Sequence, residues 1–227
     1  MQKTSPVITF SRLLFMVVAL IALVYGVVMN VTKQISTTPY LITVVTAIVG
    51  FAITYVPSLM YQTRIATLPI KLQEFIAIFT IMAMFFGEIL SFYDRFIWWD
   101  TMLHFSSGIM LSLIGLSLFK SLNQIGGNYS QGNPVVAVVF AVLFAIACGA
   151  LWEIVEFAGD SLLGMNMQRW QTISSDVQRA SNLSNPGLVN TMKDIICDVV
   201  GSLCSMALMV PFKRKSIFNS ITAQLLN

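Results

Sequence analysis

Long apolar runs constrain this chain more than any other feature. The 227-residue sequence holds six runs near the length of about 20 residues that a helix needs to cross a bilayer. Only 10% of its residues are charged, too few to cover a soluble globule. We therefore predict an all-α, polytopic membrane protein that forms a single integral-membrane domain over residues 1–227. The predicted spans are Phe10–Asn30, Tyr40–Met60, Leu72–Phe92, Thr101–Phe119, Val135–Phe157 and Leu188–Val210.

The distribution of Lys and Arg predicts the orientation. With six spans both termini lie on one side, and that side carries eight of the 13 basic residues, including the cluster Lys213–Lys215. The excess favours cytoplasmic termini. The connection over residues 159–187 then lies outside, and a polar loop of this length is typically a functional lid or a disordered segment.

Acidic residues occur where the bilayer penalises them. Seven of the ten carboxylates, together with the single histidine, fall at or inside the apolar runs, and the predicted topology places all of them toward the outer face. A carboxylate at the centre of a bilayer costs about 2.5–3.5 kcal/mol on insertion scales, so such residues usually mark a functional site. The set is Glu88, Asp100, His104, Glu153, Glu156, Asp160, Asp194 and Asp198.

The spacing of these residues predicts a metal centre. Glu153 and Glu156 are three residues apart, and Asp194 and Asp198 are four apart, so each pair shares a helix face. Carboxylate metal sites in helix bundles use such pairs to bring two ligands from one helix to a common ion. We predict these four residues as ligands. Oxygen-rich ligands suit Mg²⁺, Mn²⁺ or Ca²⁺, and Zn²⁺ would bind through His104.

His104 also lies four residues after Asp100, so we predict it as a general acid or base oriented by Asp100. Three further residues belong to the predicted surroundings of the site, each with an alternative interpretation. Glu88 can be an interfacial acid, and Asp160 can cap a turn at a helix end. Lys193 is a nearby base, but it points about 100° away from Asp194 on a helix.

The motifs Asp100-x-x-x-His104-Phe105-x-x-Gly108, Trp152-Glu153-x-x-Glu156-x-x-x-Asp160-x-x-x-Gly164 and Asp194-x-x-x-Asp198-x-x-Gly201 carry a resemblance. The chain resembles the uncharacterised bacterial inner-membrane family DUF2238 (YjdF-like), and more remotely the VanZ-like proteins associated with resistance to glycopeptide antibiotics. The match covers about residues 85–205. It implies a multi-pass protein of the bacterial plasma membrane. Asp198 stands where VanZ-like proteins usually have Asn, and Glu156 where they usually have Gln.

Three functions agree with these features. The first is a metal-dependent hydrolase or transferase that acts on a lipid or a lipid-linked substrate at the outer face. The second is a proton- or cation-coupled transporter with the acids as its coupling site. The third is a non-catalytic module that binds an envelope lipid or an antibiotic. Membrane lipids are the expected partners, and the net charge of +3 does not favour nucleic acid.

Overall fold

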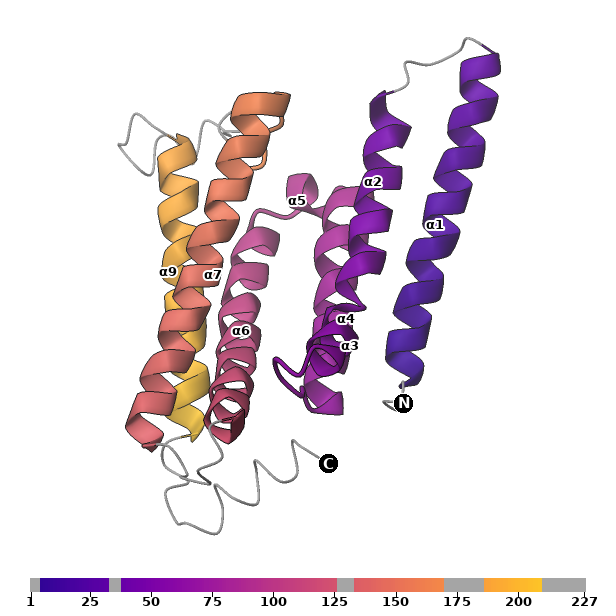
Figure 1. Ribbon diagram of the computed structural model, residues 1–227. Coiled ribbons are helices and arrows are strands. Elements are labelled where there is room, and N and C mark those ends of the chain that lie inside the picture. The colour runs from indigo at the N-terminus through magenta and orange to yellow at the C-terminus, as the bar shows by residue number, and fades with distance from the viewer. Residues whose placement is uncertain (1–4, 33–37, 126–132, 170–185, 210–227) are drawn as a thin grey trace. The chain divides into compact units, whose positions relative to one another are not determined.

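The regular structure is helical throughout the described part of the chain. The computed structural model describes residues 5–32, 38–125, 133–169 and 186–209 (Figure 1). Its elements are α1 (Pro6–Val31), α2 (Thr38–Ile53), α3 (Val56–Gln62), α4 (Ile70–Thr80), the π-helix η1 (Ile81–Ile89), α5 (Phe92–Arg95), α6 (Trp98–Ile125), α7 (Pro134–Leu163) and α9 (Pro186–Met209). The predicted all-α class is confirmed.

Five stretches are long and apolar enough to span a bilayer, and they coincide with the first five predicted spans. They are Pro6–Val31, Tyr40–Gln62, Ile70–Ile89, Trp98–Asn123 and Pro134–Leu163. The sixth predicted span forms α9, whose 24 residues suffice to cross but include Lys193, Asp194 and Asp198. The count of six and the cytoplasmic termini stay predictions. Two of the predicted features lie outside the described residues. They are the basic cluster at 213–215 and the part of the predicted outer loop that runs from residue 170 to 185.

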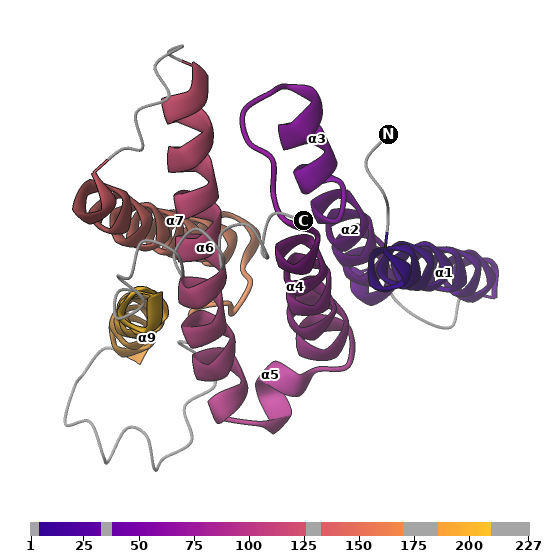
Figure 2. The same ribbon diagram turned by 90° about the horizontal axis from the view of Figure 1, so that it is seen from below.

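The chain divides into two compact units, Met1–Phe96 with Ser216–Asn227, and Ile97–Lys215. In the first unit α1 packs along α2 and also contacts α4, while α2 contacts η1 (Figure 2). Glu88 belongs to this unit, on η1. The single integral-membrane domain over the whole chain stays a prediction.

Pro57 interrupts the second span, as its lack of a backbone N–H predicts. α2 ends at Ile53 and α3 begins at Val56, with the proline in its first turn. Arg12 of α1 reaches this break. Its guanidinium donates to the Thr54 carbonyl at 3.0 Å and lies 3.8 Å from the centre of the Tyr55 ring. The half-buried arginine thus supplies donors where the helical hydrogen bonds stop.

In the second unit α6, α7 and α9 each contact the other two, and α7 runs antiparallel to both neighbours (Figures 1 and 2). Two glycines set the closest approach of α6 and α9. A Cβ on Gly108 would meet the backbone carbonyl oxygen of Asp198, and one on Gly201 would meet that of Phe105. The absence of a side chain at these glycines allows the close approach, because neither backbone could move aside for a methyl group.

The buried face of α7 is a stripe of small residues with a spacing of four. Ala137, Ala141, Ala145 and Gly149 are buried along it. Glu153 follows four residues later and therefore lies on the same buried face. Large apolar side chains elsewhere on α7 are exposed, including Leu143, Leu151, Ile154, Val155 and Phe157. The packing of the helix thus directs this carboxylate into the unit.

Candidate functional site

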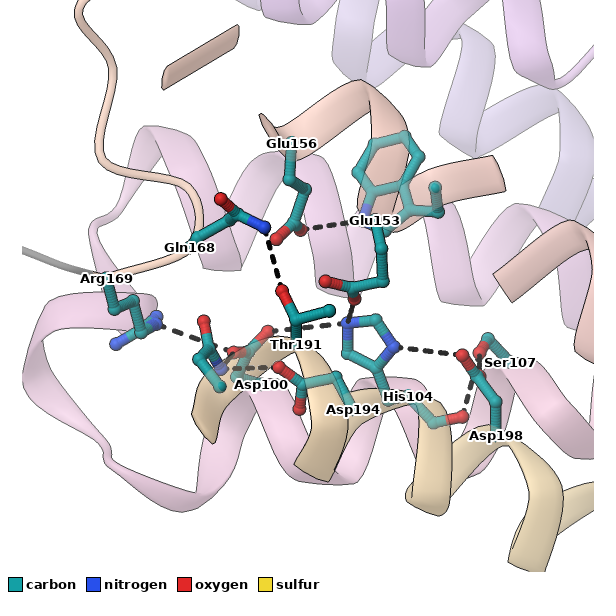
Figure 3. A network of polar contacts seen from close by, with 12 residues as sticks. Asp100, His104, Ser107, Glu153, Glu156, Gln168, Arg169, Thr191, Asp194 and Asp198 are labelled. Carbon is teal, nitrogen blue, oxygen red and sulfur yellow. Dashed lines mark hydrogen bonds and ion pairs between the residues drawn. The ribbon is translucent and has the colours of Figure 1, made fainter. Parts of the chain in front are cut away.

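The predicted acids of the second unit meet at one end of the three-helix arrangement. α6 and α9 begin where α7 ends, so the first turns of α6 lie beside the last turns of α7 (Figure 1). Five carboxylates and the only histidine are buried there (Figure 3). They are Asp100 and His104 of α6, Glu153 and Glu156 of α7, and Asp194 and Asp198 of α9. We call these six residues the acidic cluster.

Asp198 of α9 orients the side chain of His104. The Nδ1–H of the imidazole donates to one carboxylate oxygen of Asp198 at 3.2 Å, since a carboxylate can only accept. Ser107 hydrogen-bonds to the other carboxylate oxygen. A Cβ on Gly149 would lie 3.0 Å from the Asp198 carboxyl carbon, so this glycine leaves the space that the carboxylate fills. Nδ1 is therefore occupied, and only Nε2 is directed into the cluster.

Nε2 of His104 faces two other carboxylates at distances too long for hydrogen bonds. It lies 3.8 Å from an oxygen of Asp100 and 3.9 Å from an oxygen of Glu153. Glu153 is only 4% exposed, yet neither of its carboxylate oxygens has a hydrogen bond of normal geometry. Thr191 of α9 lies beside its carboxylate (Figure 3). Because a buried carboxylate without partners is costly, this residue points to a missing cation.

Asn190 connects two of the acids. Its side-chain amide donates to Asp100 at 3.2 Å and also to Asp194, one turn further along α9. The second carboxylate oxygen of Asp194 and the amide oxygen of Asn190 are buried without partners. Asp100, Asn190 and Asp194 thus bring side-chain oxygens from α6 and α9 close together. One oxygen of Asn190 and one of Asp194 can still accept a hydrogen bond or bind a cation. The sequence analysis missed Asn190, although its spacing of four from Asp194 predicts a shared face.

Glu156 has one defined partner. The indole N–H of Trp152, four residues earlier on α7, donates to Glu156 at 2.7 Å. This bond fixes the carboxylate beside Glu153 (Figure 3). Trp152 is exposed, with only the polar edge of its ring directed to the cluster.

Asp160 has a structural role, as its alternative interpretation predicts. Its two carboxylate oxygens accept the backbone N–H groups of Met167 at 2.6 Å and Gln168 at 3.0 Å. The Gln168 side chain donates to the Thr191 hydroxyl at 2.7 Å. These bonds hold residues 164–169 against both α7 and α9. We call this segment the strap.

The strap brings a cation to the edge of the cluster. Nε of Arg169 lies 3.5 Å from an oxygen of Asp100, and the arginine side chain is 22% exposed (Figure 3). A charge-assisted N–H···O bond is usually shorter, about 2.7–2.9 Å. Among the described residues, the five carboxylates of the cluster face one imidazole and the Arg169 guanidinium. If all five are ionised, their negative charge exceeds the positive charge of these two groups by at least three.

Two other residues of the predicted surroundings have exposed side chains. Lys193 is exposed on α9 beside Asp194, in the direction that the helix geometry predicts. Glu88 lies on η1 of the first unit, where its side chain is exposed, and its predicted place at the site stays a prediction.

Among the described residues, two groups of side chains are close enough to hold a metal ion. The first is Asp100, His104 and Asp194, and the second is His104, Glu153 and Glu156. Within each group the ligand atoms lie within 4.8 Å of one another. All five residues are buried, and all were predicted as site residues. Asp198 belongs to neither group, because its carboxylate is used by His104 and Ser107.

Comparisons with known proteins agree with this assignment to the membrane. Residues 10–215 match the family model described as "Predicted membrane protein (DUF2238)". An uncharacterized protein of Thermotoga maritima is 26% identical over 131 residues, which cover 57% of this chain and 56% of the relative. The chain thus spans little more than half the length of that relative. No solved structure matches.

Proposed function

The chain belongs to the DUF2238 family of predicted membrane proteins, and we propose that its acidic cluster is a divalent-metal centre with hydrolase or transferase activity on a phosphate-bearing lipid. The observation that carries the proposal is Glu153, a buried carboxylate with no hydrogen bond that faces a histidine nitrogen among further acids. A cation at this position would satisfy those oxygens and offset the repulsion between the acids.

A metal explains the cluster better than protonation or an internal salt bridge. Among the described residues, Arg169 pairs with Asp100 at the edge of the cluster, and Lys193 on α9 is exposed. Protonation would remove the repulsion, but a carboxylic acid still needs an acceptor for its proton, and Glu153 has no such hydrogen bond. Oxygen ligands with one imidazole form the donor set of Mg²⁺ and Mn²⁺, and Zn²⁺ also accepts it.

The proposal gives the ligands roles that differ in part from the sequence hypothesis. Asp100, Glu153, Glu156 and Asp194 hold the metal together with Nε2 of His104. Asp198 orients the imidazole, in place of the predicted Asp100, and is not itself a ligand. This carboxylate–histidine arrangement is the usual support of a metal-bound histidine, since it fixes the tautomer and the ring orientation.

The location of the cluster supports a lipid substrate. It lies near the ends of two apolar helices that are long enough to cross a membrane, within reach of lipid headgroups. When bound, a divalent ion polarises phosphoryl oxygens and activates a water molecule. In the proposed bacterial plasma membrane with cytoplasmic termini, the cluster faces outside. Arg169 and the strap then lie between the ligands and the aqueous phase.

Turnover of a defined lipid tests this function. Purified protein in nanodiscs would be given phosphatidic acid or undecaprenyl diphosphate with Mn²⁺, Mg²⁺ or Zn²⁺, and phosphate release would be measured. We expect release that EDTA stops and that His104→Gln abolishes. Lys193→Gln, which removes a nearby exposed charge, is the matched control and should retain activity. Metal binding without any turnover of either lipid would refute the enzymatic role and favour a binding module.

A further inference from the structure

The acidic cluster contains more carboxylates than one divalent ion can use. With one ion bound, five carboxylates would face two metal charges and the Arg169 guanidinium, and the centre would stay negative. A negative centre repels a phosphate group, which the proposed function requires it to accept. A second divalent ion would bring the balance close to neutral.

The ligand geometry also separates into two parts. The group of Asp100 and Asp194 and the group of Glu153 and Glu156 have only His104 in common. The two aspartates come from α6 and α9, and Asn190 donates to both. The two glutamates come from α7 alone. Nδ1 of His104 is bound to Asp198, so Nε2 can serve one ion only.

We propose that the cluster binds two divalent cations, and that the phosphate group of the substrate bridges them. One ion takes His104, Asp100 and Asp194. The other takes Glu153 and Glu156 and completes its shell with water and phosphate oxygens. The proposal rests on the proposed function and extends it to the number of ions and the substrate class, a phosphate ester.

Several observations support this arrangement. Glu153 is nine-tenths buried, directed into the cluster and without a hydrogen bond, so the α7 pair has acceptor capacity that the first ion does not use. Mg²⁺ is commonly held by one or two carboxylates plus substrate phosphate. Paired ions about 3.5–4 Å apart clamp both oxygens of a displacement at phosphorus. Metal binding by Asp100 would also weaken its ion pair with Arg169, whose guanidinium lies beside the proposed phosphate site.

The stoichiometry of Mn²⁺ tests the proposal on the wild-type chain. Detergent-purified full-length protein would be titrated with Mn²⁺, with bound metal measured by elemental analysis and spin coupling by electron paramagnetic resonance. We expect two ions per chain with a coupled spectrum, and inorganic phosphate should tighten the second by about tenfold, a typical coupling between ligands.

Variants locate the two ions. Glu156→Gln should bind a single ion with nearly wild-type affinity and lose the phosphate effect. Asp94→Asn removes the same charge from an exposed residue outside both ligand groups and should keep two ions. Loss of an ion in Asp94→Asn as well would overturn the assignment, because total charge rather than the glutamate pair would then set the count.

The failures of the two proposals are distinguishable. Saturation at one Mn²⁺ without spin coupling would refute the two-ion centre and leave the metal-dependent function standing. No bound Mn²⁺, Mg²⁺ or Zn²⁺ at millimolar concentration would refute both. Circular dichroism and a single gel-filtration peak would establish that each variant is folded.

Discussion

The substitution Glu153→Gln separates a metal ligand from a structural acid, because its effect on stability should change sign with the metal. Glutamine keeps the shape of the side chain and removes one buried charge. Carboxylate oxygens of Glu153 and Glu156 lie within 4.8 Å of each other. At an effective dielectric constant of about 20, two ionised groups at this distance repel by about 3 kcal/mol.

Part of that repulsion is relieved in the wild type by protonation or small movements. We therefore expect Glu153→Gln to stabilise the metal-free protein by about 1–3 kcal/mol. With Mn²⁺ at 100 times each dissociation constant, the wild type should gain about 2.7 kcal/mol by linkage for each ion. The variant should keep only the ion held by His104, Asp100 and Asp194, so it should lack the gain from the second ion, and the order of stability of the two proteins should reverse.

Thermal unfolding in detergent, with EDTA and with Mn²⁺, measures both effects. Each kcal/mol corresponds to about 2–4 °C for a chain of this size. Asp94→Asn is the control, since Asp94 is exposed in the first unit and its loss removes the same charge. A variant that is destabilised in EDTA, or that Mn²⁺ stabilises as much as the wild type, would refute the reasoning.

Three further predictions concern the surroundings of the ligands. Asp198→Asn should leave the protein folded and weaken Mn²⁺ binding by about 10–100-fold, because His104 loses the carboxylate that orients its ring. Isothermal titration measures the affinity, and unchanged binding would count against the orienting role of Asp198. Gly149→Ala should cost about 1–3 kcal/mol of stability by overpacking against the Asp198 carboxylate. Gly159→Ala on the same helix meets the flexible Met167 thioether and should cost much less in the same melting assay, so equal costs would argue against the contact. Reporter fusions at the two ends of the chain should both give cytoplasmic signals, and a periplasmic signal from the last one would exclude six spans.

The sequence predicts the pairs on single helices well. Asp100 and His104 share a face because helical geometry alone requires it. The two acids of α7 share a buried face for the same reason, and so do the two acids of α9. Hydropathy predicts the spans since lipid demands long apolar helices. The kink at Pro57 follows from a missing N–H group. Each of these features depends on local chemistry and so needs no knowledge of how helices pack.

Contacts between helices and the strap were harder to predict. The orienting partner of His104 is Asp198, which lies on another helix, whereas the sequence suggests the neighbouring Asp100. Which acid reaches the imidazole depends on the register of α6 against α9, set by Gly108 and Gly201. Asn190 has no charge and therefore gave no signal, although it bonds to two acids.

The position of α9 in the chain has a consequence for biogenesis. This helix is synthesised after α6 and α7, and it carries two aspartates whose insertion alone would each cost about 2.5–3.5 kcal/mol at the middle of a bilayer. Its entry is favourable only once earlier helices offer His104 and polar neighbours. In the proposed two-ion centre, Asp194 completes the first ligand group, so that ion would be bound only after α9 has inserted beside α6.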